Sequence, residues 1–546
     1  MLFMSSSHFI RGLKTNYKII KRMKKRILFS FEPIDWLPFL SVFWLKKGTV
    51  GKPALVLFLL SFVTCTLHAQ ISLQWVKQLG GGFDMNRELA PGPEAFNNIS
   101  RKGHSVTTDA NNNILVTGFY SDSTDFGNGV WMIPPANHKN VMFLAKYDSA
   151  GNFLFVKNFY GIGNPKHAML GHMFENTFVR TDEAGNVYMT FWLEGGQADL
   201  DPGVGVIAGQ AGKYYLVKLT DQGNFVKATM LPIFLGGRCS SNTIESVYKI
   251  TATHFYVLHH DKLYRYSLNL DLDLTIDVRV SSGLEYNELS YTGLTSFDVD
   301  DNGVIYCTFL NAKNNCELSS NVGPKPWLLK YAANGTRIWT KPFISSDISL
   351  YKNRLKATGY LPYQQQIDVD PGIDSFFVSG SAEFPGFVAD FDTAGQFLHA
   401  HTVSRFVSKN YNRSGSAAAT SITGTNSIGD MNNTNDSLRY YYEGKSGSST
   451  FLARGFTDFI VSLSDDYDNL ISLTHFGGVG DEKLYDWTVD KSGNMILVGT
   501  FSHADDCDYD PGPNTVKLIN TNMVPHPVFH DRFRTSIFVL KLKLNP

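Results

Sequence analysis

The most regular feature of the chain is a hairpin pattern in which apolar and polar residues alternate on both sides of a turn. Most copies contain an aspartate and a Gly- or Asn-containing turn between two alternating runs. They are SVTTDANNNILVTGF (105–119), FVRTDEAGNVYMTFW (178–192), SFDVDDNGVIYCTFL (296–310), QIDVDPGIDSFFVSG (366–380) and DWTVDKSGNMILVGTF (486–501). SVYKITATHFYVLHH (246–260) keeps the alternation without the glycine, and a degenerate copy starts near 417–428. Alternation with a period of two around such a turn predicts antiparallel β-hairpins.

A second hairpin pattern follows each copy of the first. Its copies are FLAKYDSAGNFLFVKNF (143–159), YLVKLTDQGNFVKATML (215–231), LYRYSLNLDLDLTIDV (263–278), LLKYAANGTRIWTKPF (328–343), FVADFDTAGQFLHAHTV (387–403), FIVSLSDDYDNLISLTHF (459–476) and FVLKLKLNP (538–546). These seven copies recur about every 66 residues, which indicates an internal structural repeat. Two successive hairpins form a four-stranded antiparallel unit that needs neighbours to bury its faces. The pattern therefore predicts an all-β fold, a seven-bladed β-propeller of four-stranded blades, with six or eight blades as the alternatives.

The seventh unit ends with its third strand, near Leu544. LQWVKQLGG, residues 73–81, has the same alternating residues, aromatic and Gly-Gly as LISLTHFGGVGD (470–481), which ends the sixth unit. We therefore predict that this N-terminal strand completes the last blade and closes the ring of blades. Backbone hydrogen bonds between the first and last strands would then replace two frayed ends.

The combined repeat resembles the SBBP β-propeller repeat of secreted bacterial proteins, which is common in the Bacteroidetes group. The matching features are W-x-x-x-x-G-G at Trp75, the D-x-x-G-N turns, D-x-D-P-G and F-h-x-K-h-D, spread over residues 71–546. The resemblance implies a propeller in an exported protein. It carries over no catalytic residues.

The N-terminal region has the pattern of a secretory signal. Lysines 46, 47 and 52 precede the apolar run 54–63, and Leu67 and Ala69 are placed for cleavage before Gln70. We expect 1–69 to be a targeting region, with a true start downstream of residue 1, and 70–546 to be the propeller. The apolar run is about half the length of a membrane-spanning helix, although an uncleaved anchor is the alternative. The expected location is secreted or in the cell envelope.

Charge and motif content narrow the class of function. The 546 residues carry 49 basic and 50 acidic side chains, a net charge of −1, which argues against nucleic-acid binding. No G-x-S-x-G, H-E-x-x-H or phosphate-loop motif is present. We expect a monomeric, non-enzymatic binding or scaffold module for a glycan or protein, without a cofactor. The alternative is a lyase or hydrolase that acts on a polysaccharide in the propeller channel.

Two aspartate-rich segments are candidate metal sites. Asp199 and Asp201 lie in DLDPG, and Asp508 and Asp510 lie in DYDPG, each between the two hairpins of a unit. Alternating carboxylates could bind Ca²⁺, a cation that prefers oxygen ligands. The alternative, which we favour, is an Asp-Pro-Gly turn in which aspartate caps the backbone. DVDPG (368–372) has the same letters but is expected at the turn of a first hairpin.

Four further features each allow more than one interpretation. DVDDNG (298–303) matches the start of an EF-hand loop, but the closing position is Phe309, so a hairpin turn is expected. Cys307 and Cys316 are close enough for a disulfide, or are buried free thiols. Loop-edge aromatics could stack on sugars or pack between blades; they are Tyr120, Trp131, Trp192, Tyr440, Tyr441, Tyr442 and Trp487. The insertion 345–366 is expected to form a small helix or lid.

Overall fold

The computed structural model is all-β in the part of the chain that it describes. That part comprises residues 71–80, 101–135, 141–160, 178–193, 198–232, 247–259, 261–278, 290–313, 325–343, 345, 347–351, 353–361, 366–372, 374–379, 386–403, 417–423, 437–441, 448–452, 457–464, 470–478, 482–501, 507–518 and 535–544. All of it belongs to one unit, Ala69–Pro546. Within these ranges, no helix has the length and apolar character needed to cross a membrane.

Six four-stranded antiparallel sheets form most of this unit; we number the sheets in chain order. Sheet 1 holds β2 (Arg101–Thr108), β3 (Ile114–Tyr120), β6 (Val141–Tyr147) and β7 (Phe153–Phe159). Sheet 2 holds β8 (Phe178–Thr181), β9 (Val187–Leu193), β12 (Lys213–Leu219) and β13 (Phe225–Leu231). Sheet 3 holds β14 (Val247–Ile250), β15 (His254–His259), β16 (Lys262–Ser267) and β17 (Leu272–Asp277). Sheet 4 holds β18 (Ser290–Val299), β19 (Ile305–Lys313), β20 (Lys325–Tyr331) and β21 (Arg337–Pro342).

The remaining sheets come from the last third of the chain and its first strand. Sheet 5 holds β22 (Asp347–Tyr351), β23 (Arg354–Tyr360), β26 (Gly386–Asp392) and β27 (Phe397–Val403). Sheet 6 holds β28 (Ala417–Thr423), β31 (Thr457–Ser464) and β32 (Leu470–Phe476). Sheet 7 holds β33 (Glu482–Val489), β34 (Asn494–Phe501), β35 (Ser536–Leu544) and β1 (Ile71–Leu79). Two-stranded hairpins branch from four sheets: β4 (Thr124–Asp125) with β5 (Trp131–Met132), β10 (Ala198–Asp199) with β11 (Ala208–Gly209), β24 (Gln366–Asp368) with β25 (Phe377–Ser379), and β29 (Ser437–Tyr441) with β30 (Ser448–Leu452).

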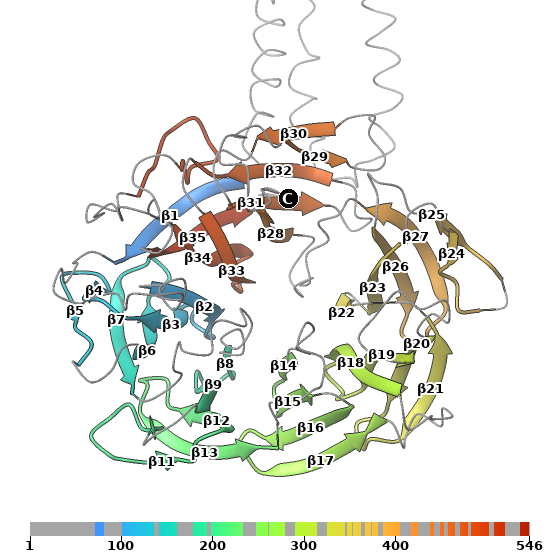
Figure 1. The fold of residues 1–546 in the computed structure, drawn as a ribbon, viewed down its shortest axis with the longest axis horizontal. Helices are drawn as coiled ribbons and strands as arrows, with labels where there is room; N and C mark the ends of the chain where they lie inside the picture. The colour runs from blue at the N-terminus through green and yellow to red at the C-terminus, as the bar shows by residue number, and fades with distance from the viewer. Residues whose placement is uncertain are drawn as a thin grey trace, which may run out of the picture. The chain divides into compact units, whose positions relative to one another are not determined.

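The sheets have a propeller arrangement (Figure 1). The first strand of each four-stranded sheet lies nearest the centre (Figure 1). Several of these strands pack against the next sheet along the chain, as β2 does against β8 and β18 against β22. Sheet 7 contacts sheet 6 through β33 and sheet 1 through β2. The predicted all-β propeller fold is confirmed at this level. The described residues form six four-stranded sheets rather than the predicted seven, because the sixth repeat contributes three paired strands.

Two predictions for the fifth repeat are wrong. Residues 366–380, expected to be its first hairpin, instead contribute the short side hairpin of β24 and β25. Residues 345–366, expected to form a helix or lid, contain the true first hairpin, β22 and β23. The sequence pattern did not indicate the turn between β22 and β23, because this turn has no glycine and uses Asn353 at φ 61° instead. Asparagine tolerates this left-handed conformation better than most residues.

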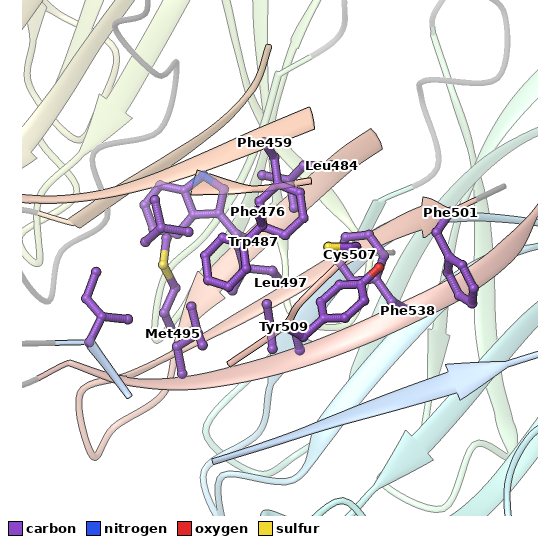
Figure 2. Close-up of a cluster of buried hydrophobic side chains, with 14 of the residues drawn as sticks. Phe459, Phe476, Leu484, Trp487, Met495, Leu497, Phe501, Cys507, Tyr509 and Phe538 are labelled. Carbon is purple, nitrogen blue, oxygen red and sulfur yellow. The ribbon is translucent and has the colours of Figure 1, made fainter. Parts of the chain in front are cut away.

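Among the residues that the structure describes, six buried hydrophobic clusters lie between neighbouring sheets. They form there because strand side chains alternate between the two faces of each sheet. Figure 2 shows the cluster that joins sheets 6 and 7, where Phe459 and Phe538 stack with ring centroids 5.4 Å apart. Trp487 and Tyr509 fill the same cluster. The core of this protein is therefore divided among the junctions between sheets, and each junction depends on both of its sheets.

Strand β1 lies at the outer edge of sheet 7, far in sequence from its partner. It pairs antiparallel with β35 from Ile71 opposite Leu544 to Leu79 opposite Ile537. Both end residues of β1 are buried. The two ends of the propeller unit thus share one sheet, as the alternation in residues 73–81 indicated.

Candidate functional site on the inner strands

The predicted metal ligands bind the backbone of their own loops. Asp199 Oδ1 accepts hydrogen bonds from the amides of Asp201 (3.0 Å) and Ile207 (2.9 Å). Asp508 Oδ1 accepts equivalent bonds from the amides of Asp510 (3.0 Å) and Val516 (2.9 Å). One carboxylate oxygen therefore ties together the two sides of each loop.

The second aspartate of each motif shapes the following turn. Asp201 Oδ1 accepts from the Gly203 amide, and Asp510 Oδ1 accepts from the Gly512 amide, both at 2.8 Å. Within the described ranges, no group of three or more His, Cys, Asp and Glu side chains is placed to hold a metal ion. The turn interpretation accounts for the positions of all four aspartates, and calcium binding there stays a prediction.

The prediction that DVDPG (368–372) forms the turn of a first hairpin is wrong. Asp368 accepts from the amides of Asp370 (3.1 Å) and Phe376 (2.9 Å), and Asp370 accepts from Gly372 (2.7 Å). This loop connects the second and third strands of sheet 5, which is the place that the other two copies occupy in sheets 2 and 7. All three copies are therefore one repeated structural element.

Each of these loops inserts one side chain into the hydrophobic core. The residue between the two aspartates is Leu200, Val369 or Tyr509, and each is 1% exposed. Phe126 has the same place in sheet 1, where Asp125 accepts from the Gly127 amide at 2.8 Å. The loops are therefore anchored on their sheets by a buried residue as well as by hydrogen bonds.

The aspartates of the first-hairpin turns are a second repeated device. Asp490 Oδ1 accepts from the amides of Ser492 (2.9 Å) and Asn494 (2.8 Å). Burial raises the pKa of Asp490, but the bonds from Asn494 and Lys541 outweigh burial and hold the pKa below its usual value. Asp300 accepts in the same way from Asn302 and Val304, so DVDDNG forms the expected hairpin turn.

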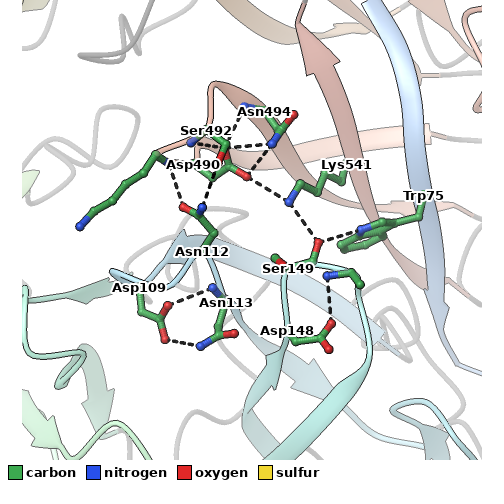
Figure 3. Close-up of polar contacts among 12 residues, drawn as sticks. Trp75, Asp109, Asn112, Asn113, Asp148, Ser149, Asp490, Ser492, Asn494 and Lys541 are labelled. Carbon is green, nitrogen blue, oxygen red and sulfur yellow. Dashed lines mark hydrogen bonds and ion pairs between the residues drawn. The ribbon is translucent and has the colours of Figure 1, made fainter.

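A cation on the third strand of five sheets links each sheet to the next one. It donates to the carbonyl oxygen of a turn in the neighbouring sheet. The pairs are Lys541 to Ser149 (3.1 Å), Lys146 to Asp221 (2.9 Å), Lys218 to Leu268 (2.9 Å), Arg265 to Ala333 and Lys330 to Thr393 (2.6 Å). Figure 3 shows the first of these links, where Trp75 Nε1 also donates to Ser149. The F-h-x-K-h-D pattern is therefore explained by contacts between sheets, which the sequence did not predict.

The inner strands carry a polar cluster that draws on three sheets. Ser105 of β2 donates its hydroxyl to Asp486 Oδ2 of β33 at 2.7 Å. The same oxygen accepts from the Val106 amide at 3.0 Å and lies 3.8 Å from Arg180 Nη1 of β8. These residues are up to 381 positions apart in sequence, so only the propeller arrangement brings them together.

Arg180 is the part of this cluster best placed to meet a ligand. Its guanidinium carbon lies 4.1 Å from the centre of the Phe178 ring, and Nη1 donates to the Val179 carbonyl at 2.8 Å. Its side chain keeps 32% of its surface exposed, against 13% for Asp486. Burial lowers the pKa of the guanidinium, and the Asp486 carboxylate opposes that shift.

Sheets 3, 4 and 5 build a second inner-strand cluster. Lys249 Nζ lies 2.6 Å from Asp298 Oδ1, while Asp298 Oδ2 accepts from the Leu350 amide at 2.8 Å. Ser296 donates to Asp347, which repeats the Ser–Asp pairing of sheets 7 and 1. Lys249 is 28% exposed and Asp298 is 5% exposed. Each cluster thus presents one partly exposed cation beside carboxylates that are buried, as Asp298 is, or half-buried, as Asp486 and Asp347 are.

Of the aromatic and cysteine candidates, some are buried in the core and one is exposed. Tyr120 and Trp487 are buried, while Trp131 is 48% exposed on β5. Trp192 and Tyr440 to Tyr442 have side chains outside the described part of the structure. Cys307 is a buried free thiol whose pKa burial raises well above its usual value. Cys316 also lies outside the described residues.

Comparison with known proteins does not name a family. No protein-family profile and no curated protein match the chain. Among solved structures, a Bacteroides caccae protein of unknown function has 12% identity and a TM-score of 0.23, with coverage of 44% of this chain and 81% of its own. Catalytically inactive virginiamycin B lyase from Staphylococcus aureus, with quinupristin, has 7% identity and a TM-score of 0.32 over 86% and 99%. The Neurospora crassa Pan2 WD40 domain has 6% identity and a TM-score of 0.27 over 85% and 95%. These low scores support no conclusion about ligand or activity.

Proposed function

We propose that this protein is a non-catalytic binding or scaffold module whose ligand, a glycan or a protein, meets the inner strands. The observation that supports this most directly is the Arg180 cluster. The guanidinium of Arg180 lies over the Phe178 ring and donates one hydrogen bond to the Val179 carbonyl. Because its orientation is already restricted, its remaining N–H groups can donate to a polar ligand at a low cost in conformational entropy. Rigid inner strands from several sheets would hold such a site in place.

The proposed architecture is a seven-bladed ring of the SBBP type, in which sheet 6 is the least regular blade. Contacts run from sheet 6 through sheet 7 and then through sheets 1 to 5, and β1 pairs with β35. In this proposal the ring closes between sheets 5 and 6. The signal-like segment before Gln70 favours an exported protein, in the envelope or secreted, that works as a monomer.

A thermal-shift assay on residues 70–546 against neutral and acidic glycans would test the proposed function. A ligand that binds only the folded state raises the midpoint as its concentration passes its dissociation constant. We expect a shift with one glycan class that is reduced at least tenfold in apparent affinity by Arg180→Ala. Lys262→Ala, which removes an exposed lysine on sheet 3, serves as the control. A shift that Arg180→Ala leaves unchanged would place the ligand elsewhere.

If no glycan raises the melting midpoint, protein ligands are tested next. The same pair of variants would then be compared in affinity capture from the envelope fraction of the source organism. A partner retained by the parent and by Lys262→Ala, but lost with Arg180→Ala, would support a protein-binding module. A partner retained equally by all three proteins would contradict a role for the inner strands.

A further inference from the structure

The sequence contains three Asn-Gly pairs, a combination in which asparagine can lose its side-chain amide without an enzyme. They are Asn128–Gly129, Asn302–Gly303 and Asn334–Gly335. The reaction begins at the backbone nitrogen of the following residue, and glycine leaves that nitrogen unshielded because it has no side chain. All three asparagines are exposed. Sequence and exposure therefore do not distinguish the three pairs, whereas the hydrogen bonds of their glycines do.

In two of the pairs, the glycine nitrogen is held inside a turn between strands. Gly303 N donates to the Asp300 carbonyl at 3.0 Å, and Gly335 N donates to the Ala332 carbonyl at 2.9 Å. Both glycines are also crowded, since a Cβ added to either would lie within 3.2 Å of a neighbouring side chain. These bonds and contacts keep the nitrogen from reaching the side chain of the preceding asparagine.

Asn128–Gly129 differs at the reacting nitrogen. The pair forms the tip of the hairpin of β4 and β5, where the Val130 amide donates to the Gly127 carbonyl at 3.1 Å. Asn128 and Gly129 have φ of 56° and 73°, which is the conformation of a tight hairpin turn. Within the described residues, neither the Gly129 amide nor the Asn128 side chain has a hydrogen-bond partner. A Cβ added to Gly129 would meet nothing within 4 Å.

The tip of this hairpin can open while its base stays on the propeller. Phe126 at the base is 1% exposed, and its carbonyl accepts a hydrogen bond from the Tyr147 hydroxyl at 2.9 Å. Asp125 exchanges backbone hydrogen bonds with Gly80. Each strand of the hairpin has two residues, so few hydrogen bonds restrain the tip. Exposed turns with few such bonds open at a small free energy, which lets the Gly129 nitrogen approach the Asn128 side chain.

We propose that Asn128–Gly129 is a self-modification site, at which the asparagine converts to aspartate and isoaspartate. The Gly129 nitrogen gives up its proton and bonds to Asn128 Cγ, while the Cγ–Nδ2 bond breaks and the amide group leaves with a proton as ammonia. Water then opens the cyclic imide that results. Opening of the bond from Cγ to nitrogen yields aspartate, and opening of the backbone bond yields isoaspartate. Each product adds a negative charge to the hairpin that exposes Trp131. This inference does not depend on the proposed function.

Peptide mass spectrometry of the purified, folded protein after incubation at mildly alkaline pH tests the site. We expect the peptide with Asn128–Gly129 to gain the mass of an NH2-to-OH exchange about tenfold faster than the peptides with the other two pairs, because only its glycine nitrogen is free. Isoaspartate, identified by electron-transfer fragmentation, should be among the products, since it forms only through the imide. Equal rates for the three peptides, or aspartate without isoaspartate, would overturn the proposal.

The same measurement in urea separates the effect of the turn from that of neighbouring residues. Unfolding removes the bonds of Gly303 and Gly335, so the three peptides should then react at similar rates. If the Asn128 peptide kept its full advantage in urea, the turn would not set the rate and the proposal would fail. Asn128→Gly keeps a residue that tolerates the left-handed turn and removes the amide. Its peptide should gain no mass, while the other two peptides behave as in the parent. A mass gain that persists in this variant would place the reaction at another residue.

Discussion

Lys541, on the last strand of the chain, donates a hydrogen bond to the backbone carbonyl of Ser149 across 392 residues of sequence. The same ammonium group lies 3.0 Å from Asp490 of its own sheet. Sheet 7 is thereby tied to sheet 1 at a point where β1, the first strand of the propeller unit, also contributes.

Deletion of residues 71–81 should destabilise the whole propeller cooperatively. The deletion exposes the edge of β35 and removes Trp75, which donates to Ser149. We expect a single unfolding transition at a clearly lower midpoint, measured by circular dichroism in parallel with intrinsic fluorescence. A truncated protein that melts like the parent would show that β1 contributes little to the fold.

Substitution of Gly151 should reveal how closely β1 approaches sheet 1. Its φ is +84°, and an added Cβ would lie 2.6 Å from Lys77 Cε and 3.0 Å from the Trp75 ring. Gly493 has φ +79° with nothing within 4 Å, so it is the matched control. Gly493→Ala should cost about 1–2 kcal/mol from backbone strain alone. Gly151→Ala should cost more in urea denaturation, and equal losses would argue against the close contact.

Lys541→Met should lower the free energy of unfolding by about 3 kcal/mol, because it leaves the buried Asp490 carboxylate without its ion pair. Both side chains are at most 5% exposed. Lys262→Met removes an exposed pair with Asp277 and should barely move the urea midpoint. Similar losses for the two variants would mean that the link to Ser149 and Asp490 contributes little.

Stability should fall in acid through the turn aspartates. The pKa of Asp490 in the folded protein lies below its usual value, as does that of Asp109. Their contribution is complete above the unfolded-state pKa of about 3.9 and is lost as the pH falls through the lower folded-state pKa. Urea midpoints from neutral pH down to about pH 2.5 would measure this loss. Asp490→Asn should make the urea midpoint depend less on pH below the unfolded-state pKa. If the variant's midpoint falls with pH as steeply as that of the parent, other groups cause the acid sensitivity.

Calcium removal should leave the thermal midpoint of the parent unchanged if Asp508 acts only on the backbone. Asp508→Ala should then lose about 1–2 kcal/mol, with or without a chelator, since two amide bonds lose their acceptor. A calcium-dependent rise in the midpoint that Asp508→Ala abolishes would instead establish a metal site.

The alternating runs and turns could be predicted from sequence because they depend on neighbouring residues. Asp109 with Asn113, for example, forms its turn within five residues. The pairing of β1 with β35 was also predictable, since the last unit lacked a strand that residues 73–81 could supply. The first hairpin of sheet 5 could not be predicted, because residues 366–380 have a stronger turn signal than residues 345–366. In the structure β22 and β23 form this first hairpin, while the loop that contains β24 and β25 inserts Val369 into the core.

Local alternation and turn chemistry therefore determined the β-hairpin repeat, because each hairpin obtains its register from residues close in sequence. Only the tertiary structure decided which repeats meet. Arg180, Ser105 and Asp486 come together from three sheets, and the linking lysines reach carbonyls 50 or more residues away. These contacts depend on how the sheets pack around a common centre, a long-range property that no single repeat encodes.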